Sequence, residues 1–133
     1  MKEKAGDVFS IAKDNMPVPG CTISKEVHGG ENGIIHFSLA KNTDISAEIF
    51  PYHKLLIVAE GSLEVYGTNE YRKVLHAGDS VLTSTDIPIG MKTDTGAVYT
   101  EIEIRRSDIM NEAIKAGEVF RLAELVPYAE GKI

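Results

Sequence analysis

The stretch AEIFPYHKLLIVAEGSLEV, residues 47–65, decides the fold. Its second half, LLIVAEGSLEV, sets an apolar run and an alternating segment on either side of Gly61, a pattern typical of adjacent β-strands. We expect Gly61 to form the tight turn between those two strands. Its first half, AEIFPYHK, raises the question of function, because it carries charged and aromatic residues at alternating positions.

Similar β-like segments extend on both sides of this stretch, separated by Gly, Asn and Asp turn signals. The last of them, AVYTEIEIRR at residues 97–106, alternates cleanly, with Tyr99, Glu101 and Glu103 on one face and Val98, Thr100 and Ile102 on the other. Many short strands at even spacing predict an all-β sandwich or barrel over residues 1–106.

The hydrophobic period changes after the last predicted strand. SDIMNEAIKAG, residues 107–117, predicts a helix that begins after Ser107 and stops at Gly117. Ile109, Ala113 and Ala116 fall on one stripe of that helix. We expect the helix to cover an open barrel end or a sheet edge.

Two distant segments of the chain resemble each other. KAGDVFSIAK at residues 4–13 and KAGEVFRLAE at residues 115–124 share six of ten residues. The similarity suggests that the tail, residues 118–133, repeats residues 7–23 and begins a second copy of the domain, although coincidence between two short amphipathic stretches is the alternative. In that interpretation the chain forms a homodimer in which the tail packs on a second copy.

Composition excludes several function classes. The chain has 133 residues, enough for one domain, and a net charge of −6, which disfavours nucleic acids and anionic membranes as partners. Its single cysteine allows neither an internal disulfide nor a thiolate metal cluster. The N-terminus lacks the apolar region of a signal peptide, and the longest apolar run, residues 55–59, is too short to span a bilayer. We therefore expect a cytoplasmic protein.

Two motifs connect the chain with a known family. VAEGSLEVYG followed by HAGDSVLTSTDIPIG resembles the cupin family, also called RmlC-like, over residues 34–104. Cupin motifs run broadly G-x5-H-x-H-x3,4-E-x6-G and G-x5-P-x-G-x2-H-x3-N, and their three His and one Glu bind a metal. Gly61, Gly78 and Pro88 match the scaffold of these motifs. The resemblance implies a jelly-roll barrel, the cupin-type double-stranded β-helix, here with a C-terminal helix.

The metal-binding positions of the motifs have all changed. The two His positions of the first motif fall on Glu48 and Phe50, its Glu position on Lys54, and the His position of the second motif on Ile89. A lysine ammonium repels a divalent metal, and Phe and Ile offer no lone pair. We therefore expect no metal and no other cofactor. A site made from His36, Glu48 and His53 is the alternative that keeps a metal.

The same positions define a candidate ligand pocket. Glu48, Phe50 and Lys54 share strand parity, so we expect them inside the barrel, with a Glu48–Lys54 contact in place of the metal–ligand bonds. A Lys54 side chain that reaches out of the barrel mouth, or a barrel filled by its own core, are the alternatives. The predicted pocket comprises His36, Glu48, Phe50, Tyr52, Lys54, Ile89 and Met91.

Three function classes remain. The first is a metal-free cupin that binds a small carboxylate or sugar-like molecule or serves in assembly. The second is a metal-independent isomerase or lyase with Lys54, Glu48 or Tyr52 as acid or base. The third is a metal-binding cupin with an atypical site. We rank binding or assembly above catalysis, because Glu48 and Lys54 are the only titratable pair that the motif provides.

Overall fold

The computed structural model describes residues 3–28 and 33–105. A short 3-10 helix, η1 (Lys13–Asn15), precedes the sheet. The eight strands fall on the segments predicted from the sequence: β1 (Thr22–His28), β2 (Ile34–Leu39), β3 (Thr43–Ile49), β4 (His53–Gly67), β5 (Arg72–His76), β6 (Ser80–Leu82), β7 (Pro88–Thr93) and β8 (Ala97–Ile104). The predicted helix at 107–117 and the tail at 118–133 lie outside the described residues, so both stay predictions.

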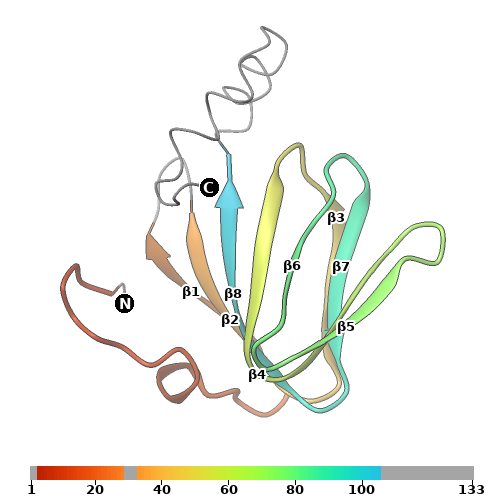
Figure 1. Cartoon of the computed structure of the whole chain (residues 1–133). Coiled ribbons are helices and arrows are strands. Elements are labelled where there is room, and N and C mark those ends of the chain that lie inside the picture. Colours follow the sequence, from red (N-terminus) through yellow and green to blue (C-terminus); the bar gives the residue numbers. More distant parts are fainter. Residues whose placement is uncertain (1–2, 29–32, 106–133) are drawn as a thin grey trace, which may run out of the picture.

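The strands form one curled antiparallel sheet. Its order is β1-β2-β8-β4-β7-β3, and β5 and β6 both pair with β4. Figure 1 shows β1, β2 and β8 on one side of β4, and β3, β5 and β7 on the other. Within residues 3–28 and 33–105, no helix is long and apolar enough to cross a membrane.

Strand β4 connects the two sides of the fold. Its first half pairs with β8 and β6, and its second half pairs with β7 and β5. A register shift between Val58 and Glu60 marks a β-bulge at the point of change. Because the bulge inserts one residue, the buried positions switch from even numbers, such as Leu56 and Val58, to odd numbers, such as Leu63 and Val65.

Gly61 lies at this bend, inside β4. The prediction of a turn between two strands is therefore wrong, since β4 continues through the glycine with a left-handed φ of 80°. A Cβ atom at this position would lie 2.0 Å from the carbonyl oxygen of Gly96. That oxygen accepts a hydrogen bond from the backbone N–H of Ser62 at 3.2 Å, which holds the two chain segments together. Glycine is required here for close backbone approach.

The core surrounds the bulge of β4 and extends along the second half of this strand. Alternate residues of the strands meet there, and the Phe37 and Tyr99 rings stack with centroids 5.1 Å apart. The buried cluster consists of Leu39, Leu56, Val58, Leu63, Val65, Leu75, Ile89, Met91, Ala97 and Tyr99. Toward the first half of β4 the side chains of the two walls do not fill the interior, and a cavity remains.

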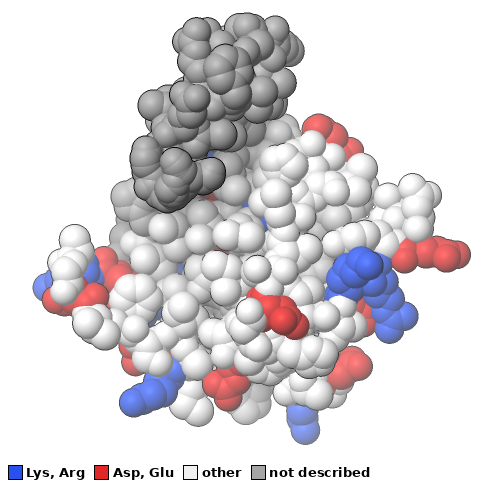
Figure 2. All heavy atoms as spheres, in the orientation of Figure 1, with Lys and Arg blue, Asp and Glu red and all other residues white. Residues whose placement is uncertain are grey.

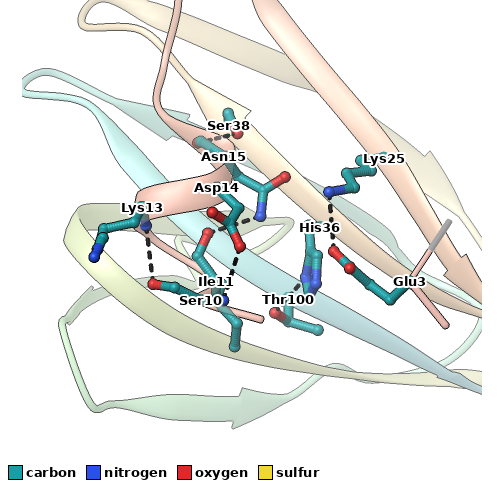
Figure 3. A network of polar contacts seen from close by, with 10 residues as sticks. All are labelled: Glu3, Ser10, Ile11, Lys13, Asp14, Asn15, Lys25, His36, Ser38 and Thr100. Atoms are coloured by element: carbon teal, nitrogen blue, oxygen red, sulfur yellow. Dashed lines mark hydrogen bonds and ion pairs between the residues drawn. The ribbon is translucent and has the colours of Figure 1, made fainter. Parts of the chain in front are cut away.

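Residues 3–15 lie across the outer face of β1, β2 and β8, and we call them the N-terminal strap (Figure 3). The Phe9 ring lies 5.5 Å from the His36 ring, and Glu3 forms an ion pair with Lys25 at 2.9 Å. The Ser38 hydroxyl donates a hydrogen bond to the carbonyl of Asn15. The strap thus covers the polar outward-facing residues of β2.

We predict that Gly61→Ala lowers the free energy of unfolding by at least about 2 kcal/mol, because the methyl group adds a backbone clash to the left-handed strain. Gly78→Ala is the matched control. The φ of Gly78 is also left-handed, at 93°, but a Cβ atom there would have no neighbour within 4 Å, so this variant has the backbone strain without the clash. Urea denaturation of both variants gives the comparison. Equal losses would contradict a packing role for Gly61.

Candidate ligand-binding site

A cavity of about 330 Å³ opens beside the first half of β4. Strands β2, β3, β7 and β8 and the segment between β6 and β7 form its walls. Apolar side chains make up most of the lining, including Ile35, Phe37, Ile45, Leu56, Ile87, Ile89 and Met91. Five charged side chains of the described part of the chain also reach it: Glu48, Lys54, Glu101, Glu103 and Arg105. The cavity therefore combines an apolar body with charged groups, as small-molecule sites do.

Lys54 is held rigidly in this cavity. Its backbone N–H donates to the Thr83 hydroxyl at 3.0 Å, and the Thr83 N–H donates to its carbonyl at 2.9 Å. The side chain is buried, with 9% of the residue exposed. Its Nζ lies 3.3 Å from Glu101 Oε2 and 3.4 Å from the centre of the Phe50 ring. The ammonium thus has one carboxylate partner and one aromatic face.

Glu101 is the most buried charged group in the cavity, with 2% of the residue exposed. Burial raises the pKa of its carboxyl group, because desolvation disfavours the charged form, while the neighbouring Lys54 ammonium acts in the opposite direction. The neighbouring Glu103 carboxylate also raises the pKa of Glu101, and the net shift is upward. Glu101 therefore takes up a proton more readily than an ordinary glutamate.

A second ion pair lies next to the first. Arg105 Nε donates to Glu103 Oε1 at 2.8 Å, and its Nη2 donates to the Tyr52 hydroxyl at 2.9 Å. The guanidinium carbon also lies 4.3 Å from the centre of the Tyr52 ring. Burial raises the pKa of Tyr52, and the Glu103 carboxylate raises it further. Tyr52 is therefore a neutral hydrogen-bonding group at ordinary pH.

The predicted contact between Glu48 and Lys54 does not form, since Lys54 pairs with Glu101. The reason lies in strand order: β8 is hydrogen-bonded to the first half of β4, whereas β3 pairs with β7 on the other side of the fold. Glu48 is exposed and lines the cavity, but it has no ion-pair or hydrogen-bond partner among the described residues.

The structure places six of the seven predicted pocket residues around the cavity: Glu48, Phe50, Tyr52, Lys54, Ile89 and Met91. His36 lies elsewhere, and its assignment to the pocket is corrected. On β2 the side chains of Ile35 and Phe37 face the cavity, so His36 points to the opposite side of the sheet, beneath the strap. There its Nδ1 lies 2.9 Å from the Thr100 hydroxyl, and burial lowers its pKa.

Comparison with solved structures agrees with this architecture. The conserved protein SPY1581 of unknown function from Streptococcus pyogenes is 16% identical, with a TM-score of 0.71 over 77% of this chain and 90% of that one. An RmlC-like cupin family protein with a double-stranded β-helix fold from Methanocaldococcus jannaschii is 11% identical, with a TM-score of 0.63 over 82% of this chain and 99% of that one. This chain has the cupin fold. Its sequence matches no protein-family model and no curated protein.

A third similar structure is that of an enzyme. DMSP lyase DddQ from Ruegeria pomeroyi is 12% identical, with a TM-score of 0.56 over 62% of this chain and 46% of that one. At this identity the likeness extends to the fold alone.

The side chains at the metal positions of the cupin motifs do not fit a metal ion. Glu48, Phe50, Lys54 and Ile89 all line the cavity, but Glu48 is the only one of them with oxygen ligands, and Lys54 brings a positive charge. The alternative site of His36, Glu48 and His53 does not assemble, because His36 faces the opposite side of the sheet and His53 is not among the residues that line the cavity with Glu48. Among the described residues, no group of three or more His, Cys, Asp or Glu is placed to hold a metal.

Sequence reasoning missed three charged residues of this cupin cavity: Glu101, Glu103 and Arg105. Strand alternation could have located them, because all three have odd numbers, like Tyr99. Tyr99 is a large aromatic residue of the core, so side chains on its face of β8 are expected to point into the barrel. Charged residues on an alternating strand normally face water, and this ordinary expectation concealed the signal.

We predict that Lys54→Met destabilises the barrel by about 3 kcal/mol at neutral pH, because it leaves the buried Glu101 carboxylate without its partner. Replacing both residues, as Lys54→Met with Glu101→Leu, should recover most of the loss. Urea denaturation of the three proteins measures both effects. A single variant as stable as the double variant would show that the pair is not coupled.

We predict a pH dependence that originates at Glu101. Its folded-state pKa is raised above the ordinary 4.5, so the folded state binds this proton more readily than the unfolded state. Stability from this group should therefore fall as pH rises from about 4.5 through the raised value. Subtracting the unfolding free energy of Glu101→Gln from that of the wild type isolates this contribution. A difference that stays constant or increases over this window would contradict the assignment.

Proposed function

We propose that this cupin binds a small organic molecule in its barrel cavity without a metal ion. The observation that carries the proposal is the Lys54–Glu101 pair, which lies in a cavity of about 330 Å³ and in which Lys54 itself occupies one of the positions where cupin motifs carry metal ligands. A buried ion pair contributes little net stability compared with apolar packing, so its presence in a cavity is best explained by recognition of a ligand.

The two kinds of wall define the ligand's general shape. One side of the cavity offers Ile45, Ile89 and Met91, and the other offers the ion pairs and the Tyr52 hydroxyl. A ligand that fits this cavity therefore has a compact polar end and an apolar or ring-shaped body. The carboxylate or sugar-like molecules expected from the sequence both meet this general description.

Catalysis is the second candidate function. The favouring observation is a carboxyl group with a raised pKa, Glu101, only 3.3 Å from an ammonium group inside a cavity. Such a pair supplies a general base and an electrostatic partner for a developing negative charge, as a metal-independent isomerase or lyase needs. Tyr52 and Glu48 line the same cavity. Binding precedes either outcome and is tested first.

Assembly through the tail, residues 118–133, lies outside the described residues, so the expected homodimer stays a prediction. The same holds for a cytoplasmic location and for the exclusion of nucleic acids. On the face shown in Figure 2, acidic and basic side chains of the described part are interspersed around its edge, and no broad basic surface forms there.

A cavity-blocking variant tests the proposed function. Ser46 is an exposed residue that lines the cavity, so Ser46→Trp should fill it, while Asp44→Trp on the same strand β3 lies outside it. We expect members of a panel of short amines, carboxylates, alcohols and monosaccharides to raise the melting temperature of the wild type and of Asp44→Trp, but not of Ser46→Trp. Calorimetry then gives the dissociation constants. Equal stabilisation of Ser46→Trp, or no response from the whole panel, would contradict binding in the barrel.

A further inference from the structure

We infer that the polar end of the ligand is a compact cation, such as a primary amine, and that the Glu48 carboxylate is its anchor. This inference rests on the proposed binding function and narrows it to one class of molecule. It follows from the pairing of charges around the cavity, from the positions of the aromatic rings and from the place of Glu48 in the sheet.

The charges of the cavity are unequally matched. Among the residues that the structure describes, its lining carries two cations, Lys54 and Arg105, and three carboxylates, Glu48, Glu101 and Glu103. Lys54 pairs with Glu101 and Arg105 pairs with Glu103. Glu48 is the carboxylate that remains without a partner among the described residues. The unmatched charge that a ligand meets is therefore negative.

A carboxylate ligand would have to compete for cations that are already engaged. The Lys54 ammonium contacts Glu101 and the Phe50 ring, and the Arg105 guanidinium contacts Glu103 and the Tyr52 ring. Taking Lys54 away from Glu101 would leave a carboxylate that is almost completely buried without its partner. An ammonium group beside Glu48 requires no such rearrangement.

The electrostatic environment of Tyr52 agrees with this charge count. After burial, the charged groups that raise its pKa are Glu103, Glu101 and Glu48, and the charged group that lowers it is Arg105. Three carboxylates and one guanidinium thus act on a hydroxyl group in the cavity. A field of this sign attracts cations.

Glu48 also lies where a ligand's apolar body can follow. It is directly opposite Ile89 in the pairing of β3 with β7, and Ile45 and Met91 form another opposed pair of the same two strands. All four side chains line the cavity. An amine bound to Glu48 would therefore carry its hydrocarbon part along the apolar wall.

Three probes of one shape test the inference: cyclohexylamine, cyclohexanol and cyclohexanecarboxylate, titrated at neutral pH and low salt. We expect the amine to bind at least about fivefold more tightly than the other two, which corresponds to the upper end for an exposed ion pair. Glu48→Gln should reduce amine affinity by a similar factor and leave cyclohexanol affinity unchanged. Asp44→Asn, an exposed acid on the same strand outside the cavity, is the matched control and should change neither.

The outcomes separate the two proposals. If cyclohexanecarboxylate or cyclohexanol binds as tightly as the amine, or if Glu48→Gln and Asp44→Asn have the same effect, the cationic class is overturned while the binding function stands. If none of the three probes binds at millimolar concentration and no member of the wider panel does, both fail. Chemical-shift changes confined to residues of the cavity would confirm the location in the favourable case.

Discussion

The contact between the backbone at Gly61 and the carbonyl oxygen of Gly96 sets the form of the barrel. It allows a single strand, β4, to leave one side of the sheet and join the other without ending. The bulge beside it changes the parity of the strand, so that both halves present buried side chains to the interior. Every other strand except β1, β2 and β3 pairs with β4 directly, so the bend determines where each wall stands.

The interior created by this bend has two chemically different ends. Around the bulge of β4 and along its second half it is filled by aliphatic and aromatic packing, which accounts for stability. Beside the first half, Lys54 and Glu101 occupy an interior that apolar residues would stabilise as well or better. The fold therefore accommodates a costly polar arrangement at one end. This division of the interior is what connects the architecture with ligand binding.

Local sequence patterns predicted the strands, because alternation and turn residues act over a few positions, as in residues 97–106. They placed Glu48, Phe50 and Lys54 around one interior for the same reason, and all three line the cavity although Phe50 lies between β3 and β4. The partner of Lys54 was not predictable in this way, since it depends on β8 being the neighbour of β4 across some fifty intervening residues. His36 shows the complementary failure. Its predicted place in the pocket left its neighbours Ile35 and Phe37 out of account, and these two face the cavity. The strap that buries His36 on the outer face gives no local signal in the sequence of β2. The predicted turn at Gly61 failed because a left-handed glycine serves a bulge as well as a turn.

Strand β4 and strand β3, which carries Glu48, should differ in how fast their backbone amides exchange with solvent, because β4 has hydrogen-bonded neighbours on both edges. The backbone amides of β4 are engaged by β8 and β6 along one half and by β7 and β5 along the other, so they should exchange with solvent only when the whole domain opens. In the described chain β3 pairs with β7 alone and ends the sheet order, so its amides should exchange through local fraying. The barrel thus combines a slowly exchanging frame for the ion pairs with a more rapidly exchanging wall on one side.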